Sequence, residues 1–320
     1  MLSIIISVYD VGPYIEECVN SVLELTISCE VIIVHDEQKD KSFKGDEEFL
    51  KDKRIIILNR PNAGLGMARN QGLEVAKGEY VHFLDGDDKV FADRMERLYH
   101  NGVAAGADII CGNFDDTDTP KKCQGPKGKE AIKGSEFLYR YCDTMNTCVW
   151  RYIFKKSFLT DNSLVFDSVK YFEDLAFLPR ALYQANTIYF EDIAFYYYRY
   201  TENTLSNVFN KKRTLDIMTC YIILNNESKN MIPEVGGVLR NLINELVLGT
   251  IYNSRHNKGF DLDVIQASKY CVDSMQASNT RERLLLCANH LNWSLFLSLN
   301  DAYFGTRILL GNVKQKIKNK

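Results

Sequence analysis

The sequence predicts an α/β protein with a mostly parallel sheet flanked by helices, followed by a mainly helical region. Short apolar runs alternate with helical patterns through about the first 110 residues, and from about residue 211 the helical pattern continues with few strand signals. A length of 320 residues indicates about two domains. We expect the boundary between them near residue 210.

Each expected element follows from its own pattern. Five short apolar runs are typical of buried strands: 2–8, 31–34, 54–58, 80–84 and 109–111. Apolar residues three and four apart predict four helices: 15–23, 67–76, 95–103 and 137–145. A polar stretch with Pro and Gly, 115–133, is expected to be a loop that separates a first half, 1–112, from a second half, 134–210.

Composition excludes several classes of protein. A net charge of −3 and an isoelectric point near 6.0 argue against a nucleic-acid binder. The nine cysteines form no Cys-x-x-Cys pair, which favours reduced thiols over a zinc site. The apolar run at the N-terminus is too short for a signal peptide, and no run approaches the roughly 18 residues of a membrane span. We therefore expect a cytoplasmic protein.

Charge differs between the two parts of the chain. Residues 1–210 carry 24 Lys and Arg against 33 Asp and Glu, whereas residues 211–320 carry 15 against 9. The last of these residues, 308–320, include four lysines and no acid, a pattern that suits either an anionic membrane surface or a solvated end. Different partners are expected for the two parts.

Three carboxylates directly follow the strand expected at 80–84: Asp85, Asp87 and Asp88. Ligands bind at the carboxyl ends of strands in open α/β sheets. Like charges packed there favour a hard divalent cation, which takes carboxylate and phosphate oxygens. An Asp-rich turn that caps the next helix is the alternative.

Two further segments could carry chemistry. Gly64 and Gly66 open a helix after a strand, as in phosphate-binding loops, and they partly match a dinucleotide fingerprint, although Arg69 replaces its third glycine. Glu173 and Asp174 lie near a helix start, where a carboxylate could act as a general base or only cap the helix. A similar Glu-Asp pair at 191–192 lies in a strand-like segment, where we expect a solvated face.

The order of these segments resembles the family 2 inverting glycosyltransferases of the GT-A fold over about 200 residues. The matching segments are 7–10, 16–22, 30–36, 62–72, 78–80, 83–88, Trp150, 166–167, 173–174 and 198–199. One segment departs from the family pattern, because His35-Asp36-Glu37-Gln38 stands where Asp-Asp-Gly-Ser is common. The Gln-x-x-Arg-Trp signature of processive relatives is absent, so the resemblance implies addition of a single sugar.

The resemblance implies a role for each matching residue. It assigns nucleotide-sugar binding to Val8, Tyr9, Asp36, Asn62, Gly64, Arg69, Asp85 and Asp87. Of these, Val8, Tyr9, Asp36 and Arg69 would hold the base. It also implies a Mn²⁺ or Mg²⁺ ion on Asp87 and Asp88, a catalytic base at Asp174, and acceptor contacts at Trp150 and Glu173. Residues 1–112 would then bind the nucleotide sugar, and residues 134–210 the acceptor.

The implied activity is metal-dependent, inverting transfer of a hexose or N-acetylhexosamine from a UDP-sugar to a glycan or lipid-linked glycan in cell-surface polysaccharide synthesis. The enzyme would work in the cytoplasm or at the cytoplasmic face of the membrane. Acceptor cover, a homodimer contact and membrane docking all fit residues 211–320. Two other functions stay open: a dinucleotide-dependent oxidoreductase and a non-catalytic scaffold in a polysaccharide-synthesis complex.

Overall fold

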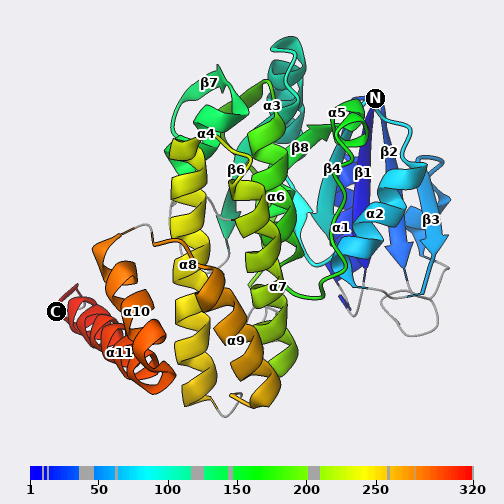
Figure 1. Cartoon of the computed structure of the whole chain (residues 1–320). Coiled ribbons are helices and arrows are strands. Elements are labelled where there is room, and N and C mark those ends of the chain that lie inside the picture. Colours follow the sequence, from blue (N-terminus) through cyan, green and yellow to red (C-terminus); the bar gives the residue numbers. More distant parts are fainter. Residues whose placement is uncertain are drawn as a thin grey trace. The chain divides into compact units, whose positions relative to one another are not determined.

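The computed structural model describes residues 1–8, 11–12, 14–35, 47–61, 64–116, 126–142, 147–200, 210–257, 260–277 and 279–318. The chain divides into two compact units, Met1–Asn207 and Val208–Lys320. The first unit is a sheet with helices on both faces, and the second unit is entirely helical in its described part (Figure 1).

The described strands of the first unit form one nine-stranded sheet in the order β3-β2-β1-β4-β8-β6-β9-β5, with β7 paired to β9. The strands are β1 (Leu2–Val8), β2 (Cys29–His35), β3 (Ile55–Asn59), β4 (Tyr80–Asp85), β5 (Lys89–Val90), β6 (Ile109–Asp116), β7 (Lys129–Ile132), β8 (Tyr152–Lys155) and β9 (Ile188–Tyr198). The pairs β1–β2, β1–β4 and β2–β3 are parallel, whereas β8 runs antiparallel to both β4 and β6. The five expected strands are confirmed, and the sheet is parallel through β4 and mixed beyond it.

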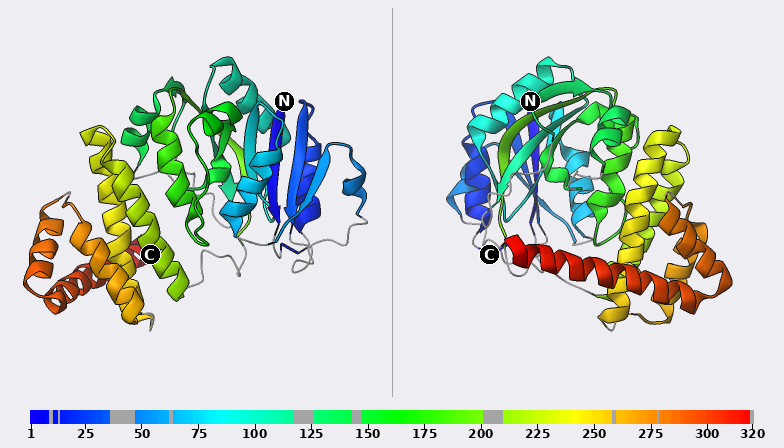
Figure 2. Two further views of the ribbon diagram at one scale, coloured as in Figure 1. Left: turned by 45° about the vertical axis from the view of Figure 1, so that its right-hand side comes forward. Right: turned by 90° about the vertical axis from the view of Figure 1, so that its left-hand side faces the viewer.

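Helices cover both faces of this sheet (Figure 2). They are α1 (Tyr14–Leu23), α2 (Leu65–Val75), α3 (Ala92–Ala104), α4 (Gly134–Tyr141), α5 (Lys156–Asp161) and α6 (Glu173–Gln184), with short 3₁₀ turns η1 (Glu48–Lys51) and η2 (Val149–Arg151). One core holds Ile4 and Ile6 of β1 together with the apolar faces of α1 and α3. On the opposite face, Gly72 of α2 lies against Ile5, where an added Cβ would come within 2.4 Å of its side chain. Close packing therefore requires a glycine at this point of α2.

Two expectations for residues 115–192 were wrong in part, since Asp192 is exposed as expected. The stretch expected to be a loop contains β7, which pairs antiparallel with β9. The expected solvated face at 191–192 is half buried, because Glu191 packs under α3 and accepts hydrogen bonds from Arg97, Asn101 and the Tyr189 hydroxyl. These three donors satisfy the Glu191 carboxylate, whose burial the sequence pattern of the strand alone does not predict.

The second unit consists of α7 (Lys211–Ser228), α8 (Pro233–His256), α9 (Leu262–Ser274), α10 (Thr280–Leu291) and α11 (Trp293–Lys318). Side chains cap three of these helices: Asn210, Asp261 and Asn279 each accept a hydrogen bond from a backbone N–H of the first turn. The helices of the described chain are all too short or too polar to cross a bilayer.

A buried histidine in β4 gives the fold an acid-sensitive point. His82 is fully buried against Phe195, its Nδ1 lies 3.1 Å from the Tyr152 carbonyl oxygen, and burial lowers its pKa to about 4. The unfolded chain binds this proton near pH 6.5, so the group's stabilisation is complete above that pH and is lost as the pH falls toward 4.

We expect His82→Gln to remove this pH dependence while keeping an N–H near the carbonyl. The wild-type free energy of unfolding should fall by up to about 3 kcal/mol more than that of the variant between pH 6.5 and pH 4. Urea denaturation at several pH values measures the difference. Parallel pH profiles for the two proteins would show that His82 does not carry the effect.

Candidate active site

The site lies where β1 and β4 end. These strands are parallel neighbours with Ser7 opposite Asp85, and the Gly86 N–H donates to the Ser7 carbonyl oxygen at 3.3 Å. Val8, the last residue of β1, is buried beside this turn. The sheet therefore brings the acidic segment 85–88 next to the strand end expected to hold the nucleotide base.

Arg69 joins this segment to α6. Its guanidinium is buried, with Nη2 2.9 Å from Asp85 Oδ1, and Nη1 2.8 Å from Glu173 Oε1 and 2.6 Å from Asp174 Oδ1. Burial acts to lower the pKa of Arg69, but these three carboxylates together raise it above its usual value. The side chain that the resemblance assigns to the nucleotide base thus bridges both acidic segments.

Asp174 is held at both oxygens. Oδ1 pairs with Arg69, and Oδ2 accepts a hydrogen bond from the Val149 backbone N–H at 2.9 Å. Burial raises the pKa of Asp174 above its usual range, while Arg69 acts to lower it. The side chain keeps 16% of its surface exposed. Asp174 is therefore oriented, open at one side, and closer to the pKa of a general base at neutral pH than an exposed carboxylate is.

Local backbone features position the start of α6. Phe172, directly before Glu173, has a left-handed conformation (φ 64°, ψ 27°) that costs free energy in a residue with a side chain. Gly66 of α2 lies beneath Glu173, and a Cβ at this position would come within 3.1 Å of the Glu173 Cβ. The glycine that opens α2 thus makes room for the acidic start of α6.

Asp88 is anchored by β9. The Tyr196 hydroxyl donates to its Oδ2 at 2.6 Å, and the Arg199 backbone N–H donates to its Oδ1 at 2.7 Å. Arg199 also donates from Nε to the Asp87 carbonyl oxygen at 2.9 Å, and its Nη2 lies 2.5 Å from Glu17 Oε2. Tyr196 of β9 and Arg199, directly after β9, therefore hold the acidic segment 85–88 in place.

The neighbouring acids fit a cation. Burial, followed by repulsion from Asp85, raises the pKa of Asp87 to about 6, and burial with repulsion from Asp87 and Asp85 raises that of Asp88 to about 8. These carboxylates are thus unfavourable as anions without a positive partner. Within the described residues no three His, Cys, Asp or Glu side chains form a complete cage. An oxygen-only, incomplete set suits Mg²⁺ or Mn²⁺ that also binds diphosphate oxygens.

The two residues expected to contact the acceptor, Trp150 and Glu173, are both buried. Trp150 is only 5% exposed and belongs to the core, where its ring stacks on Tyr196 at 4.3 Å between centroids. It therefore offers no open platform for a sugar. Glu173 is buried as well, and its carboxylate pairs with Arg69. Both side chains therefore hold other residues of the site in place, Trp150 through Tyr196 and Glu173 through Arg69.

Other expected site residues are only partly described. Gly64 precedes α2, where its carbonyl oxygen accepts from the Ala68 N–H at 3.0 Å and its φ of 100° suits glycine. Three residues expected to bind the nucleotide sugar, Tyr9, Asp36 and Asn62, lie outside the described residues.

Sequence reasoning missed three residues of this site. Val149 contributes only its backbone, which no side-chain pattern reveals. Tyr196 lies outside every segment to which the sequence assigns a role, and Arg199 belongs to a matching segment without an assigned role. Both contact Asp88 across more than 100 residues of sequence, so that no local spacing connects them.

Known proteins that are similar to this chain include glycosyltransferases. Residues 3–156 match the family described as glycosyl transferase family 2. The uncharacterized glycosyltransferase EpsJ of Bacillus subtilis is 31% identical over 218 residues, which are 65% of this chain and 63% of EpsJ. The poly(ribitol-phosphate) beta-glucosyltransferase of Bacillus spizizenii is 28% identical over 62% of this chain and 32% of its own length. The chain thus matches less than two thirds of the length of these relatives.

Solved structures extend the likeness to almost the whole chain. Residues 1–349 of S. aureus TarS, crystallised in complex with UDP-GlcNAc, superpose with a TM-score of 0.74 at 19% identity, covering 95% of this chain and 92% of that one. At this identity the likeness establishes the fold, which is that of a GT-A protein with a helical C-terminal region. The chain therefore has the GT-A fold, and its residues 3–156 match the family 2 glycosyltransferases.

Proposed function

We propose that this protein is an inverting glycosyltransferase that moves a hexose or N-acetylhexosamine from a UDP-sugar to a glycan or lipid-linked glycan during synthesis of a cell-surface polymer. The observation that carries the proposal is the bridge from Asp85 through Arg69 to Asp174. It links an acidic strand end, suited to a cation and a diphosphate, to an oriented carboxylate. The relatives named above and the UDP-GlcNAc held by TarS support the donor class and the pathway class.

Asp174 is the proposed catalytic base. An acceptor hydroxyl is a poor nucleophile at neutral pH, and a positioned carboxylate that removes its proton contributes typically about 10²–10⁴-fold. Arg69 and the Val149 N–H prevent the carboxylate from rotating. A single displacement opposite the leaving diphosphate inverts the anomeric carbon and needs no enzyme nucleophile.

Asp87 is the proposed metal ligand. The main role proposed for Asp88 is to anchor the acidic segment 85–88. Both oxygens of Asp88 already accept hydrogen bonds, and its side chain is buried, whereas Asp87 is partly exposed. A bound Mn²⁺ or Mg²⁺ would neutralise charge that develops on the departing diphosphate. Arg199 and Tyr196 hold the segment in place for it.

This division of roles predicts unequal effects of two substitutions. Asp87→Asn should weaken Mn²⁺-dependent UDP binding by more than about 100-fold, because a direct ligand is lost. Tyr196→Phe should weaken it by only about 10-fold, since it removes one hydrogen bond behind the site. Calorimetric titration of UDP with and without Mn²⁺ measures both. Equal losses in the two variants would contradict the separate roles.

Release of UDP from a panel of UDP-sugars tests the activity, with a mixture of glycan acceptors and Mn²⁺ present. We expect one or two donors to be consumed, and the anomeric configuration of the product, read by NMR, to be inverted. A thermal shift produced by NAD(P)H and not by UDP would favour the oxidoreductase instead. Absence of turnover with all common donors would favour the scaffold.

A further inference from the structure

Three aromatic rings stack beside the acidic segment 85–88. The Trp150 ring is nearly parallel to the rings of Tyr196 and Tyr198, with centroids 4.3 Å and 5.7 Å away and interplanar angles of 13° and 16°. Tyr196 is fully buried and Trp150 is almost so, whereas Tyr198 is partly exposed. The stack therefore reaches solvent at Tyr198.

Packing fixes the position of the Tyr198 ring. β9 pairs with β6 along its length up to this residue, and alternation of side chains places Tyr196 and Tyr198 on one face of β9. Phe114 of β6 meets Trp150 and Tyr198 edge-on, with 4.9 Å and 6.4 Å between ring centroids. Because the ring is already held in place, a ligand that contacts it loses little affinity to side-chain ordering.

Tyr198 borders the acidic segment of the candidate active site. The next residue, Arg199, donates its backbone N–H to Asp88 Oδ1 at 2.7 Å and its Nε–H to the Asp87 carbonyl oxygen at 2.9 Å. Burial, followed by the negative charges of Asp88 and Asp87, raises the pKa of the Tyr198 phenol to about 12. The phenol thus lies beside the proposed metal ligand and keeps its proton at neutral pH.

Cys148 connects Tyr198 to the proposed catalytic base. Its neighbour Val149 donates the backbone N–H that holds Asp174 Oδ2 at 2.9 Å. Cys148 is partly exposed, and burial followed by the charge of Asp174 raises the pKa of its thiol. Cys148 is also a neighbour of Tyr198, whose pKa it raises less than burial does. The two side chains therefore lie between the acidic segment and Asp174.

The chemistry of this surface suits a sugar ring. A pyranose has a face of C–H groups, which packs on an aromatic ring, and hydroxyl groups, which pair with a phenol and with carboxylates. The sugar of a nucleotide sugar is bonded directly to the diphosphate, so it lies next to the group that a metal on Asp87 would hold. The acceptor enters on the side of Asp174. The position of Tyr198 beside Asp87 favours the donor sugar.

We propose that Tyr198 contacts the hexose or N-acetylhexosamine ring of the bound UDP-sugar and makes the site prefer UDP-sugar over free UDP. The inference rests on the proposed function and gives Tyr198 a sugar contact of the kind expected of the buried Trp150. The exposed surface of the ring packs on the sugar, and the phenol O–H donates to a sugar hydroxyl. Free UDP lacks the sugar and gains nothing from this contact.

Calorimetric titration with Mn²⁺ and without acceptor measures the contact, with UDP, UDP-glucose, UDP-galactose and UDP-N-acetylglucosamine as probes. We expect Tyr198→Leu to weaken binding of the UDP-sugar that the wild type prefers by about tenfold and to leave UDP affinity within about twofold. Tyr198→Phe keeps the ring and loses one hydrogen bond, so it should weaken UDP-sugar binding by about threefold at most. The thermal midpoint of each variant is measured first.

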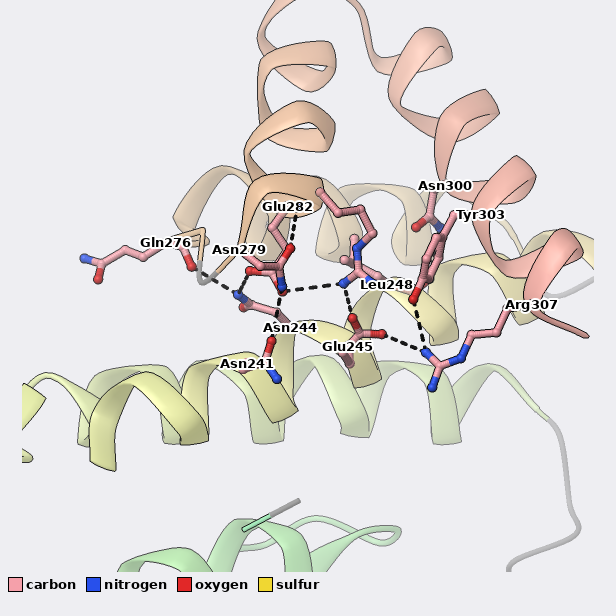
Figure 3. Close-up of polar contacts among 11 residues, drawn as sticks. Asn241, Asn244, Glu245, Leu248, Gln276, Asn279, Glu282, Asn300, Tyr303 and Arg307 are labelled. Carbon is pink, nitrogen blue, oxygen red and sulfur yellow. Dashed lines mark hydrogen bonds and ion pairs between the residues drawn. The ribbon is translucent and has the colours of Figure 1, made fainter. Parts of the chain in front are cut away.

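Tyr303→Leu is the matched control. Tyr303 is a partly buried tyrosine of the helical unit, where its hydroxyl oxygen lies 3.3 Å from Arg307 Nη1 (Figure 3). Its ring centre lies 4.3 Å from the Arg281 guanidinium. The substitution thus removes an aromatic ring and a hydrogen bond, as at Tyr198, and should leave the affinities for UDP and for the UDP-sugar at their wild-type values.

Equal weakening of UDP and UDP-sugar by Tyr198→Leu would show that Tyr198 only supports the site, and unchanged affinity for both would show no contact. An unchanged donor affinity with a raised KM for the acceptor would assign the ring to the acceptor. Each of these three results would overturn the inference.

Saturation-transfer NMR on the wild type tests the contact without any variant that could fail to fold. We expect irradiation of aromatic protons to saturate the sugar protons of the bound UDP-sugar, and absence of this transfer would overturn the inference. A wild type that binds none of the four nucleotides would count against the proposed function itself. Failure of the inference alone requires a wild type that binds the UDP-sugar.

Discussion

Asp174→Asn is expected to lower transfer by about 10²–10⁴-fold and to leave UDP affinity within a few-fold of the wild-type value. Asparagine keeps the shape of the side chain, but its single amide oxygen can accept from Arg69 or from the Val149 N–H and not from both, and it cannot take a proton from the acceptor. Initial rates with the donor identified in the panel, together with calorimetric titration of UDP, separate the chemical step from binding.

Asp192→Asn is the matched control, because Asp192 stands in the second copy of the Phe-Glu-Asp sequence. Its side chain is 40% exposed in β9 and pairs with Lys127 at 3.5 Å, away from the Arg69 cluster. We expect near wild-type rates. Loss of turnover in Asp192→Asn with retained turnover in Asp174→Asn would show that Asp192 is the base and that the assignment to Asp174 is wrong.

Arg69→Met is expected to destabilise the protein by about 3–5 kcal/mol at pH 7, because it leaves buried carboxylates without their cation. Three acids share this one guanidinium, two of them on α6 and one at the end of β4. Methionine fills similar volume, so the loss reflects charge more than a cavity. Urea denaturation at pH 7 measures the change in the free energy of unfolding.

The pH dependence of the destabilisation by Arg69→Met shows whether unpaired charge or lost packing causes it. Without Arg69 the pKa values of Glu173 and Asp174 rise further above their unfolded values, so the stability of the variant falls as pH rises. The deficit relative to the wild type should be small near pH 4 and grow toward pH 7. A deficit that stays constant across this range would indicate lost packing in place of unpaired charge.

The fold was predictable from sequence where local patterns were strong. Strands β1 to β4 are continuous apolar runs, and the stripe of α1 repeats at three and four residues, so each element could be assigned without its neighbours. Strand β7 could not, because its first three residues, Lys129, Glu130 and Ala131, are exposed and only its pairing with β9 makes it a strand. Pairing partners far apart in sequence leave no local signal.

The site was predictable in its acids and not in their partners. The carboxylates of segments 85–88 and 173–174 stood out by type and order along the chain. Arg69 reaches Glu173 and Asp174 across 104 and 105 residues, and only the folded sheet brings α2 to α6. Trp150 illustrates the opposite error, since an aromatic ring suited to a sugar is covered by Tyr196 in the core.

A crystal structure with a UDP-sugar and Mn²⁺ tests the central claim most directly. The ion should lie between Asp87 and the diphosphate, with the anomeric carbon facing the side where Asp174 Oδ atoms could reach an acceptor oxygen at about 3 Å. A nucleotide bound away from the strand ends at Val8 and Asp85 would contradict this placement of the site. A sugar whose anomeric carbon is screened from Asp174 by the diphosphate would contradict it equally.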